Sequence, residues 1–273
     1  MKKSVITITT LFLSFVLIAQ SYKPEQVDPD TMESIPMRVI DNSAFQAGEM
    51  LKYKIHYGFV DAGEVVLKVE NSSYNFGDRE AFHIIGTGKS LGGFDWFFKV
   101  RDRYETYIDK QGIFPYRFVR EVSEGGYEIH QDYTFLPWKK AVKTDAQKTY
   151  KTPAFIQDML SSFYYTRTLD FSNIGSGDTF MIETIIDGEI FPLQIKYIKT
   201  ENIKIRSGKF RCMKFVPILQ EGRVFENEED LNVWITDDEN KIPILVKSKL
   251  MVGSIKMEMT EWLGVANSIA IID

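Results

Sequence analysis

Alternating apolar and polar positions dominate the chain from about residue 44 onward. The clearest case is the segment Glu49 to Phe59, where one face carries Leu51, Tyr53, Ile55, Tyr57 and Phe59. Because side chains on a β-strand point alternately to two faces, this period of two predicts a half-buried antiparallel strand. A second alternating run, with Val65, Leu67 and Val69 on one face, follows the segment 60–63. We therefore expect residues 60–63 to connect the two strands of a hairpin.

The same period continues through most of the chain and predicts about twelve or more strands. The further strand segments are 81–87, 94–108, 113–122, 127–136, 139–143, 178–186, 189–199, 203–206, 209–219, 231–236, 242–250 and 254–262. Turn signals separate them, and Asp187-Gly188 is a strong hairpin signal. Because these segments leave no room for crossover helices, a meander is expected in place of parallel βαβ units.

One stretch breaks the strand pattern and predicts a single internal helix from Pro153 to Thr168. Thr152 can cap it, Pro153 suits its first turn, and Met159 and Phe163 follow at helical spacing. The expected fold is therefore mainly β. It is a large curved antiparallel sheet, a half barrel or open barrel, with this helix packed across its concave or open side. Two sequential β-lobes separated by the helix are the alternative.

The first twenty residues predict a secretory signal peptide. Lys2 and Lys3 precede an apolar run from Val5 to Ile18, which is too short to span a bilayer comfortably. The mature protein is expected to be periplasmic or extracellular, with no transmembrane anchor. Cys212 is the only cysteine, so no lipid-anchored cysteine follows the cleavage region, and we expect this thiol to be buried as a small hydrophobe.

The remaining organisation follows from composition. Residues 21–43 are polar and contain three prolines, which indicates an extended lead-in before a single β-rich domain over residues 44–265 and a tail over 266–273.

Without residues 1–20 the chain has 31 basic and 38 acidic residues, since Lys2 and Lys3 are lost from a total of 33 basic residues. This mild acidity disfavours nucleic acid and anionic membrane surfaces, which require clustered basic charge.

Several stretches together resemble DUF3108, a family of exported bacterial proteins. They are Phe45 to Tyr53, Tyr57 to Glu64, Tyr104 to Asp109, Gln157 to Arg167, Val233 to Asp238, Ile242-Pro243 and Val252 to Ile255. The resemblance implies an envelope protein with a fold similar to the half-barrel carriers of lipoproteins and lipids. The name of the family records an unknown function, so the resemblance supplies no catalytic residue.

Aromatic residues make up 14% of the chain and suggest where a ligand would bind. The candidate ligand-binding residues are Tyr53, Tyr57, Trp96, Phe98 and Tyr104 on the strands, with Met159 and Phe163 on the helix. They form either a filled core or the wall of a cavity, and composition does not distinguish filled from hollow barrels.

The first hypothesis is a non-enzymatic envelope protein that carries a lipid or another amphipathic molecule. The second is a structural or interaction module that binds an envelope protein through sheet edges or the lead-in.

A third hypothesis, a hydrolase, has the weakest support. Gly88-Lys89-Ser90-Leu91-Gly92 matches a nucleophile elbow, but that motif needs a helix after the serine, where the pattern predicts a strand. The histidines His56, His83 and His130 lie far apart in sequence, without metal-site spacing. The acidic clusters at 226–230 and 237–239 lack the spacing of a calcium loop. We therefore predict no catalytic residue, no metal site and no cofactor.

Overall fold

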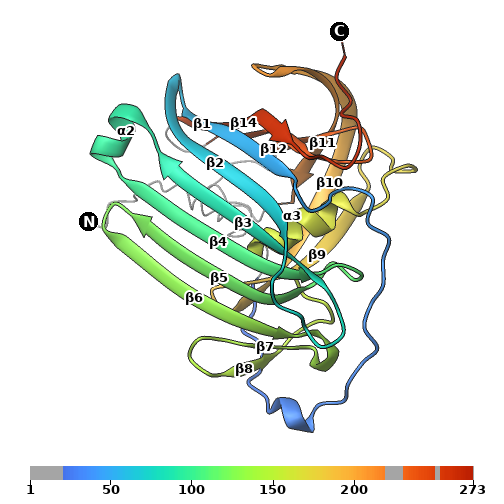
Figure 1. Ribbon diagram of the computed structural model, residues 1–273. Coiled ribbons are helices and arrows are strands. Elements are labelled where there is room, and N and C mark those ends of the chain that lie inside the picture. The colour runs from blue at the N-terminus through green and yellow to red at the C-terminus, as the bar shows by residue number, and fades with distance from the viewer. Residues whose placement is uncertain (1–20, 219–229, 250–252, 273) are drawn as a thin grey trace.

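Fourteen antiparallel strands form one curved sheet in the computed structural model, which describes residues 21–218, 230–249 and 253–272 (Figure 1). Residues 1–20, which are predicted to form a signal peptide, and the acidic residues Glu226, Glu228 and Glu229 lie outside the described residues. The strands are β1 (Met50–Tyr57), β2 (Val60–Asn71), β3 (Ala81–Ser90), β4 (Val100–Asp109), β5 (Pro115–Glu124), β6 (Tyr127–Leu136), β7 (Ala141–Lys143), β8 (Thr149–Lys151), β9 (Thr179–Ile186), β10 (Glu189–Ile205), β11 (Gly208–Pro217), β12 (Leu231–Thr236), β13 (Pro243–Lys249) and β14 (Ser254–Leu263). The helical segments are η1 (Pro29–Thr31), α2 (Gly92–Phe97), η2 (Pro137–Lys139) and α3 (Met159–Arg167).

The strand order joins the two halves of the chain into a continuous sheet. It runs from β8 through consecutive neighbours to β1, and then from β14 back to β9. The junction is made by β1, in which Tyr53 pairs with Val65 of β2 on one side and with Met259 of β14 on the other. The expected curved, open antiparallel sheet is confirmed, and the alternative of two sequential lobes is wrong.

The open gap of the sheet lies between the edge strands β8 and β9, and the lead-in crosses it. The backbone of Tyr22 exchanges two hydrogen bonds with Ile190 of β10, at 3.0 and 2.9 Å. A few residues later, the N–H of Val27 donates to the carbonyl of Thr149 in β8 at 2.9 Å. The lead-in is therefore attached to the edge strand β8 and to the beginning of β10, and it satisfies backbone groups there that neighbouring strands leave unpaired.

A bulge in β2 lies close to the β1–β2 turn. The register of β1 with β2 shifts between Ile55 and His56, and Ala62 of β2 is the extra residue. His56 is buried, and Phe59 is fully exposed in the turn between Tyr57 and Val60. The prediction that Phe59 shares the inward face with Tyr53 is therefore wrong, as is the prediction that residues 60–63 form the connection.

The segment predicted as a strand from residue 94 begins as a helix. Gly92 has a φ of +54°, which ends the extended backbone of β3, and α2 then runs to Phe97. Trp96 consequently lies on the exterior with 91% of its surface exposed, and Phe98 is half-buried. The expected strand face shared by Trp96, Phe98 and Tyr104 does not form, because only the part of the segment from Val100 onward is extended.

The internal helix is present, but it is shorter than predicted. It begins at Met159, and its N-cap is Asp158, whose side chain accepts hydrogen bonds from the N–H groups of Leu160 and Ser161, both at 2.8 Å. The Ser161 hydroxyl accepts from the Asp158 N–H at 2.8 Å and completes a capping box. The Thr152 cap and the start at Pro153 are wrong because this reciprocal pair satisfies the backbone N–H groups of the first turn further along the chain.

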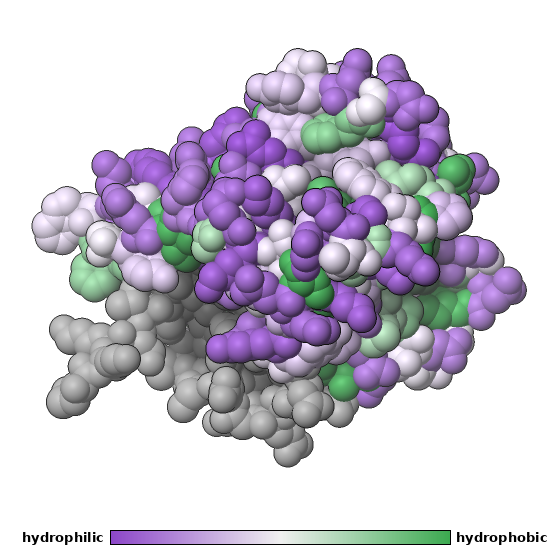
Figure 2. Space-filling model, turned by 90° about the horizontal axis from the view of Figure 1, so that it is seen from below, coloured by the Kyte–Doolittle hydropathy of each residue, from purple (hydrophilic) through white to green (hydrophobic). Residues whose placement is uncertain are grey.

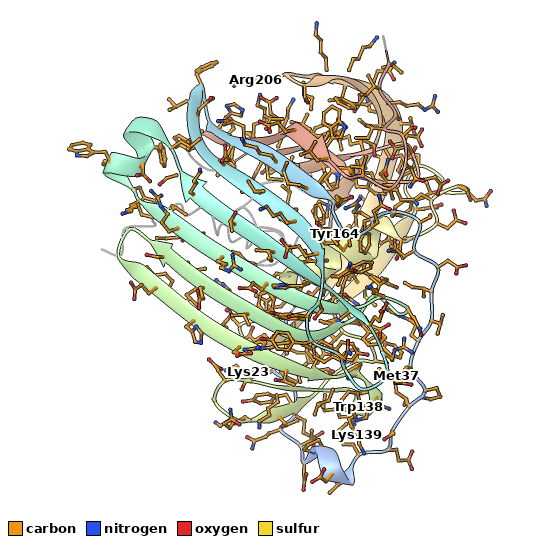
Figure 3. All side chains as sticks on the ribbon, viewed as in Figure 1. Lys23, Met37, Trp138, Lys139, Tyr164 and Arg206 are labelled. Carbon is orange, nitrogen blue, oxygen red and sulfur yellow. The ribbon has the colours of Figure 1, made fainter. Side chains whose placement is uncertain are left out.

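Side chains fill most of the space between α3 and the concave face of the sheet. Figure 3 shows Tyr164 of α3 in this interior, while Trp138, Lys139 and Met37 lie near the end of the molecule that holds β7 and β8. Seen from below, the surface is mainly hydrophilic with small scattered apolar patches (Figure 2). Within the described part of the chain, no helix is long and apolar enough to cross a membrane.

Candidate ligand-binding pocket

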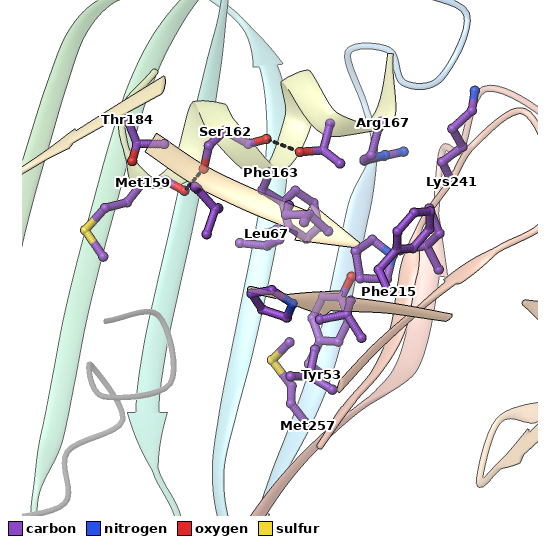
Figure 4. Close-up of a pocket in the computed structure, with 18 of the residues that line it drawn as sticks. Tyr53, Leu67, Met159, Ser162, Phe163, Arg167, Thr184, Phe215, Lys241 and Met257 are labelled. Carbon is purple, nitrogen blue, oxygen red and sulfur yellow. Dashed lines mark hydrogen bonds between the residues drawn. The ribbon is translucent and has the colours of Figure 1, made fainter. Parts of the chain in front are cut away.

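A pocket of about 120 Å³ lies between α3 and the concave face of the sheet (Figure 4). Its walls come from α3, from β1 and β2, and from β9 to β14. The lining residues are Tyr53, Val65, Leu67, Met159, Ser162, Phe163, Thr166, Arg167, Phe180, Thr184, Ile186, Leu193, Ile195, Phe215, Pro217, Val233, Ile235, Lys241, Pro243, Val246 and Met257. Most of these side chains are apolar, as is usual for pockets that bind small molecules. An apolar cavity of about 150 Å³ in another protein binds benzene, so this volume suits a ring or a short stretch of alkyl chain.

Two buried anchors hold α3 over the pocket. At its N-terminal end, the Asp158 carboxylate accepts a hydrogen bond from the Thr106 hydroxyl of β4 at 2.6 Å. At its C-terminal end, the Arg167 guanidinium donates to both carboxylate oxygens of Glu49 at 2.6 and 2.7 Å, and neither side chain is exposed. Bidentate pairing of this kind fixes direction as well as distance. The helix that forms one wall is thus attached to sheet segments far away in the sequence.

Three hydroxyl groups in the pocket wall already donate hydrogen bonds to nearby carbonyls. Ser162 donates to the carbonyl of Met159 at 2.9 Å, and Thr166 donates to that of Ser162 at 2.8 Å. Thr184 donates to the carbonyl of Phe191 at 2.8 Å. Each hydroxyl already donates its only hydrogen to a carbonyl. These residues therefore present mainly their carbon atoms and oxygen lone pairs to the pocket.

The hydroxyl of Tyr53 is the exception on this wall. Its ring points from β1 into the pocket (Figure 4), and the side chain is almost completely buried. The hydroxyl has no hydrogen-bond partner among the described residues. Burial raises the pKa of Tyr53, so the phenol stays neutral and retains its proton as a donor. A buried hydroxyl without a partner is costly, and a ligand atom that hydrogen-bonds to it removes that cost.

Of the seven residues predicted to bind a ligand, three line this pocket. They are Tyr53, Met159 and Phe163, which approach it from β1 and from α3. The other four, Tyr57, Trp96, Phe98 and Tyr104, are not among its lining residues. The predicted set therefore combines residues of this pocket with residues of other regions.

The four remaining residues have separate surroundings. Tyr104 is buried in the core on β4, with its ring centroid 6.4 Å from that of Phe118. Tyr57 lies at the end of β1 with its ring 6.4 Å from Phe94 of α2. Phe98 covers Gly125, where a Cβ atom would lie only 2.2 Å from the Phe98 ring, and Trp96 is exposed on α2.

Nothing in the sequence pattern marks the pocket walls that the second half of the chain contributes. Phe180, Leu193 and Phe215 on β9 to β11 belong to strands that were predicted, but nothing in the pattern assigned them to a cavity. Arg167 could have been noticed. It lies four and eight positions after Phe163 and Met159, on the same helix face, and an arginine in an apolar stripe indicates a buried partner.

The serine of the elbow motif has a structural role. A helix does follow Ser90, contrary to the predicted strand, but the Ser90 hydroxyl donates to Asp95 at 2.5 Å and accepts from the Val100 N–H at 2.9 Å. His130 lies exposed on β6, 3.7 Å from Glu121. No histidine contacts Ser90 among the hydrogen bonds of the described residues, so the base that a nucleophilic serine needs is not in place.

The side chains of the other candidate metal and acidic sites form ion pairs and hydrogen bonds within the fold. His56 bridges Asp61 and Glu258 at 2.8 and 2.9 Å, and His83 binds Glu105 at 2.6 Å. Asp238 accepts hydrogen bonds from its own turn, including the hydroxyl of Thr236 and the N–H of Asn240. The described residues contain no group of three or more histidine, cysteine or acidic side chains placed to hold a metal ion.

Comparisons with known proteins give a family and a fold. Residues 52–260 match the family described as "Protein of unknown function (DUF3108)". No curated protein matches the sequence significantly. A β-barrel-like protein of the domain of unknown function DUF1849 from Brucella abortus superposes with a TM-score of 0.52 at 10% identity, covering 87% of this chain and 100% of that chain. A provisionally assigned lipoprotein from Parabacteroides distasonis gives a TM-score of 0.36 at 11% identity, covering 84% of this chain and 100% of that chain.

Proposed function

We propose that this protein is a non-enzymatic envelope protein that binds a hydrophobic or amphipathic ligand. The chain belongs to the DUF3108 family. The observation that carries the proposal is the pocket beneath α3, which combines an apolar wall with the buried hydroxyl of Tyr53. Among the described residues that line the pocket, no nucleophile is paired with a base. The pocket therefore suits binding better than catalysis.

The wall chemistry defines the ligand class. The apolar lining favours a hydrocarbon ring or chain, since burial of apolar surface supplies most of the binding energy. The neutral Tyr53 hydroxyl favours one polar atom on that hydrocarbon, such as an alcohol, ester or carbonyl oxygen. Arg167 adds little affinity for a charged head group, because Glu49 already neutralises it at 2.6 Å. A lipid or another amphipathic molecule meets these requirements.

The proposed location follows from the N-terminal pattern. Two lysines, an apolar run and a small-residue region over residues 1–20 are typical of export by a signal peptide. The mature protein is then periplasmic or extracellular. Attachment through a lipid-modified cysteine is not part of the proposal, because Cys212 is the only cysteine and is completely buried in β11.

Two experiments test the binding function. The first is native mass spectrometry of mature protein purified from its own envelope, before and after organic extraction. A co-purifying mass that is lost on extraction is expected, and a clean apo mass counts against the proposal. The second compares benzyl alcohol with toluene, which have similar size but differ in one hydroxyl, by titration followed with NMR.

The variants for the second experiment are Tyr53→Phe and Tyr164→Phe. Both remove a buried hydroxyl that has no partner among the described residues, but only Tyr53 lines the pocket. We expect Tyr53→Phe to weaken benzyl alcohol binding roughly fivefold, equivalent to about 1 kcal/mol for one hydrogen bond, and to leave toluene binding unchanged. Tyr164→Phe should affect neither ligand. Equal affinity of wild type and Tyr53→Phe for both compounds would contradict the assigned role of Tyr53.

A further inference from the structure

Four aromatic side chains project into solvent at one end of the sheet. Phe59 is 106% exposed, Trp96 91%, Phe97 81% and Tyr127 63%. They belong to the β1–β2 turn, to α2 and to the beginning of β6, and we call them the aromatic rim. Most other aromatic side chains of the described residues are buried or half-buried, so this group is unusual within the protein.

The three connections that carry the aromatic rim lie next to one another. The ring of Phe94 in α2 is 6.4 Å from the ring of Tyr57, the last residue before the β1–β2 turn. On the other side, Phe98 at the end of α2 covers Gly125 in the β5–β6 turn, and the Gly125 N–H donates to the carbonyl of Lys99 at 2.9 Å. Figure 1 shows α2 between these two turns. The exposed rings therefore occupy one continuous edge of the molecule.

Folding does not account for the position of these rings. None of the six residues of α2 is buried, so Trp96 and Phe97 add nothing to the core. Phe59 lies in the β1–β2 turn with its side chain fully exposed, so it also adds nothing to the core. Clustered exposed apolar side chains of this kind mark an interaction surface.

The shape and charge of the rim favour a lipid surface. The rings stand on three neighbouring connections, and each projects into solvent with more than half of its surface exposed. Tryptophan and tyrosine are the side chains enriched at the membrane–water interface. Two acids beside the rim are paired within the protein, Asp95 with Arg101 at 2.6 Å and Asp61 with Arg206 at 3.4 Å. The other exposed charges next to the rim are the acidic Glu128 and the basic Lys99, so the rim has no excess of basic charge and fits zwitterionic headgroups.

We propose that the aromatic rim docks the protein on the surface of a zwitterionic phospholipid bilayer. The rings of Phe59 and Phe97 enter the boundary between headgroups and acyl chains, and Trp96 and Tyr127 lie at headgroup level. Docking places the ends of β1 and β2 at the membrane, and both strands also line the pocket through Tyr53, Val65 and Leu67. The proposal itself does not depend on the pocket holding a ligand.

The test is flotation of the mature protein with phosphatidylcholine vesicles. The variant F59S/W96S/F97S should reduce the partition coefficient at least about tenfold, equivalent to 1.4 kcal/mol. The matched control is Y74S/L263S, which removes two exposed apolar side chains from the opposite ends of the strands and should leave partitioning unchanged. Because the attraction is not ionic, raising the salt concentration should not release the wild type.

Tryptophan fluorescence gives a second measurement. The emission of the wild type should shift to the blue when vesicles are added, and Trp96→Phe should abolish that shift. Wild-type protein that stays in the vesicle-free fraction would overturn the proposal, as would an equal loss of binding in the control. A change of solution mass in F59S/W96S/F97S without vesicles would assign the rim to self-association instead. Tyr53→Phe should float normally, which separates a failure of docking from a failure of ligand binding.

Discussion

The buried pair of Arg167 and Glu49 allows a quantitative prediction. In the variant Glu49→Gln the guanidinium keeps its bonds to the carbonyls of Asn240 and Ala44, at 2.8 and 2.9 Å, but loses its counter-charge. Removing one partner of a buried pair costs about 3–5 kcal/mol, because the other charge is left uncompensated away from water. For a domain of this size each 1 kcal/mol lowers the melting temperature by roughly 2–4 °C, so we expect a decrease of roughly 6–20 °C.

Thermal and urea unfolding followed by circular dichroism measure this effect. The matched control is Glu261→Gln, which makes the same chemical change in the exposed pair that Glu261 forms with Lys52 at 3.2 Å. An exposed pair contributes about 0–1 kcal/mol, so the control should unfold almost as the wild type does. Hydrogen exchange should also show faster opening of α3 in Glu49→Gln, because the helix loses its C-terminal anchor.

The double variant Glu49→Leu/Arg167→Met separates the charge from the packing. It leaves no buried charge and roughly conserves volume, so it should recover most of the stability lost in Glu49→Gln. The reasoning is refuted if Glu49→Gln and Glu261→Gln unfold at the same temperature. It is also refuted if the double variant is less stable than the single one, because the pair would then stabilise the protein by more than charge neutralisation.

Three further predictions concern other parts of the fold. Burial and the neighbouring Glu124 raise the pKa of Asp102 from 3.8 to about 8, so the folded state favours the protonated acid, and stability should decline between about pH 4 and pH 8. Asp102→Asn should flatten that decline in urea titrations. Gly86→Val should lower the free energy of unfolding by about 1–3 kcal/mol, because a Cβ atom on β3 would lie only 3.2 Å from Leu67 of β2 and the larger side chain would also press on Leu160 of α3. Burial raises the pKa of Cys212 to about 12, so iodoacetamide should modify it only after unfolding.

Local patterns predicted the strands because each carries its own alternation. The segments 127–136 and 231–236 match β6 and β12 at both ends, and Asp187-Gly188 forms the β9–β10 turn with φ values of +51° and +76°. The lack of room for crossover helices also predicted an antiparallel meander, and the large number of strands predicted that the sheet curls on itself. These features depend on neighbouring residues only, and the sequence displays them directly.

Features that depend on distant residues or on very short elements were not predictable. The six residues of α2 cover less than two turns, so their aromatic pattern fits a strand equally well. The bulge at Ala62 lies within β2 beside Asp61 and Gly63, residue types that are typical of turns, so the pattern placed the connection at 60–63. The bond between Arg167 and Glu49 joins residues 118 positions apart, so only the fold reveals it.

Ligand binding and the docking of α3 are coupled by this architecture. The helix forms one wall of the pocket, and Glu49 and Thr106 hold its two ends against the sheet. A pocket of about 120 Å³ accepts a benzene-sized group, so a ligand that places a larger group beneath α3 needs a pocket wall to move, and α3 is the wall held by two anchors. Displacement requires breaking an anchor, and the cost of that break is subtracted from the binding energy. Glu49→Gln should therefore bind large amphipathic ligands more readily than the wild type while being less stable.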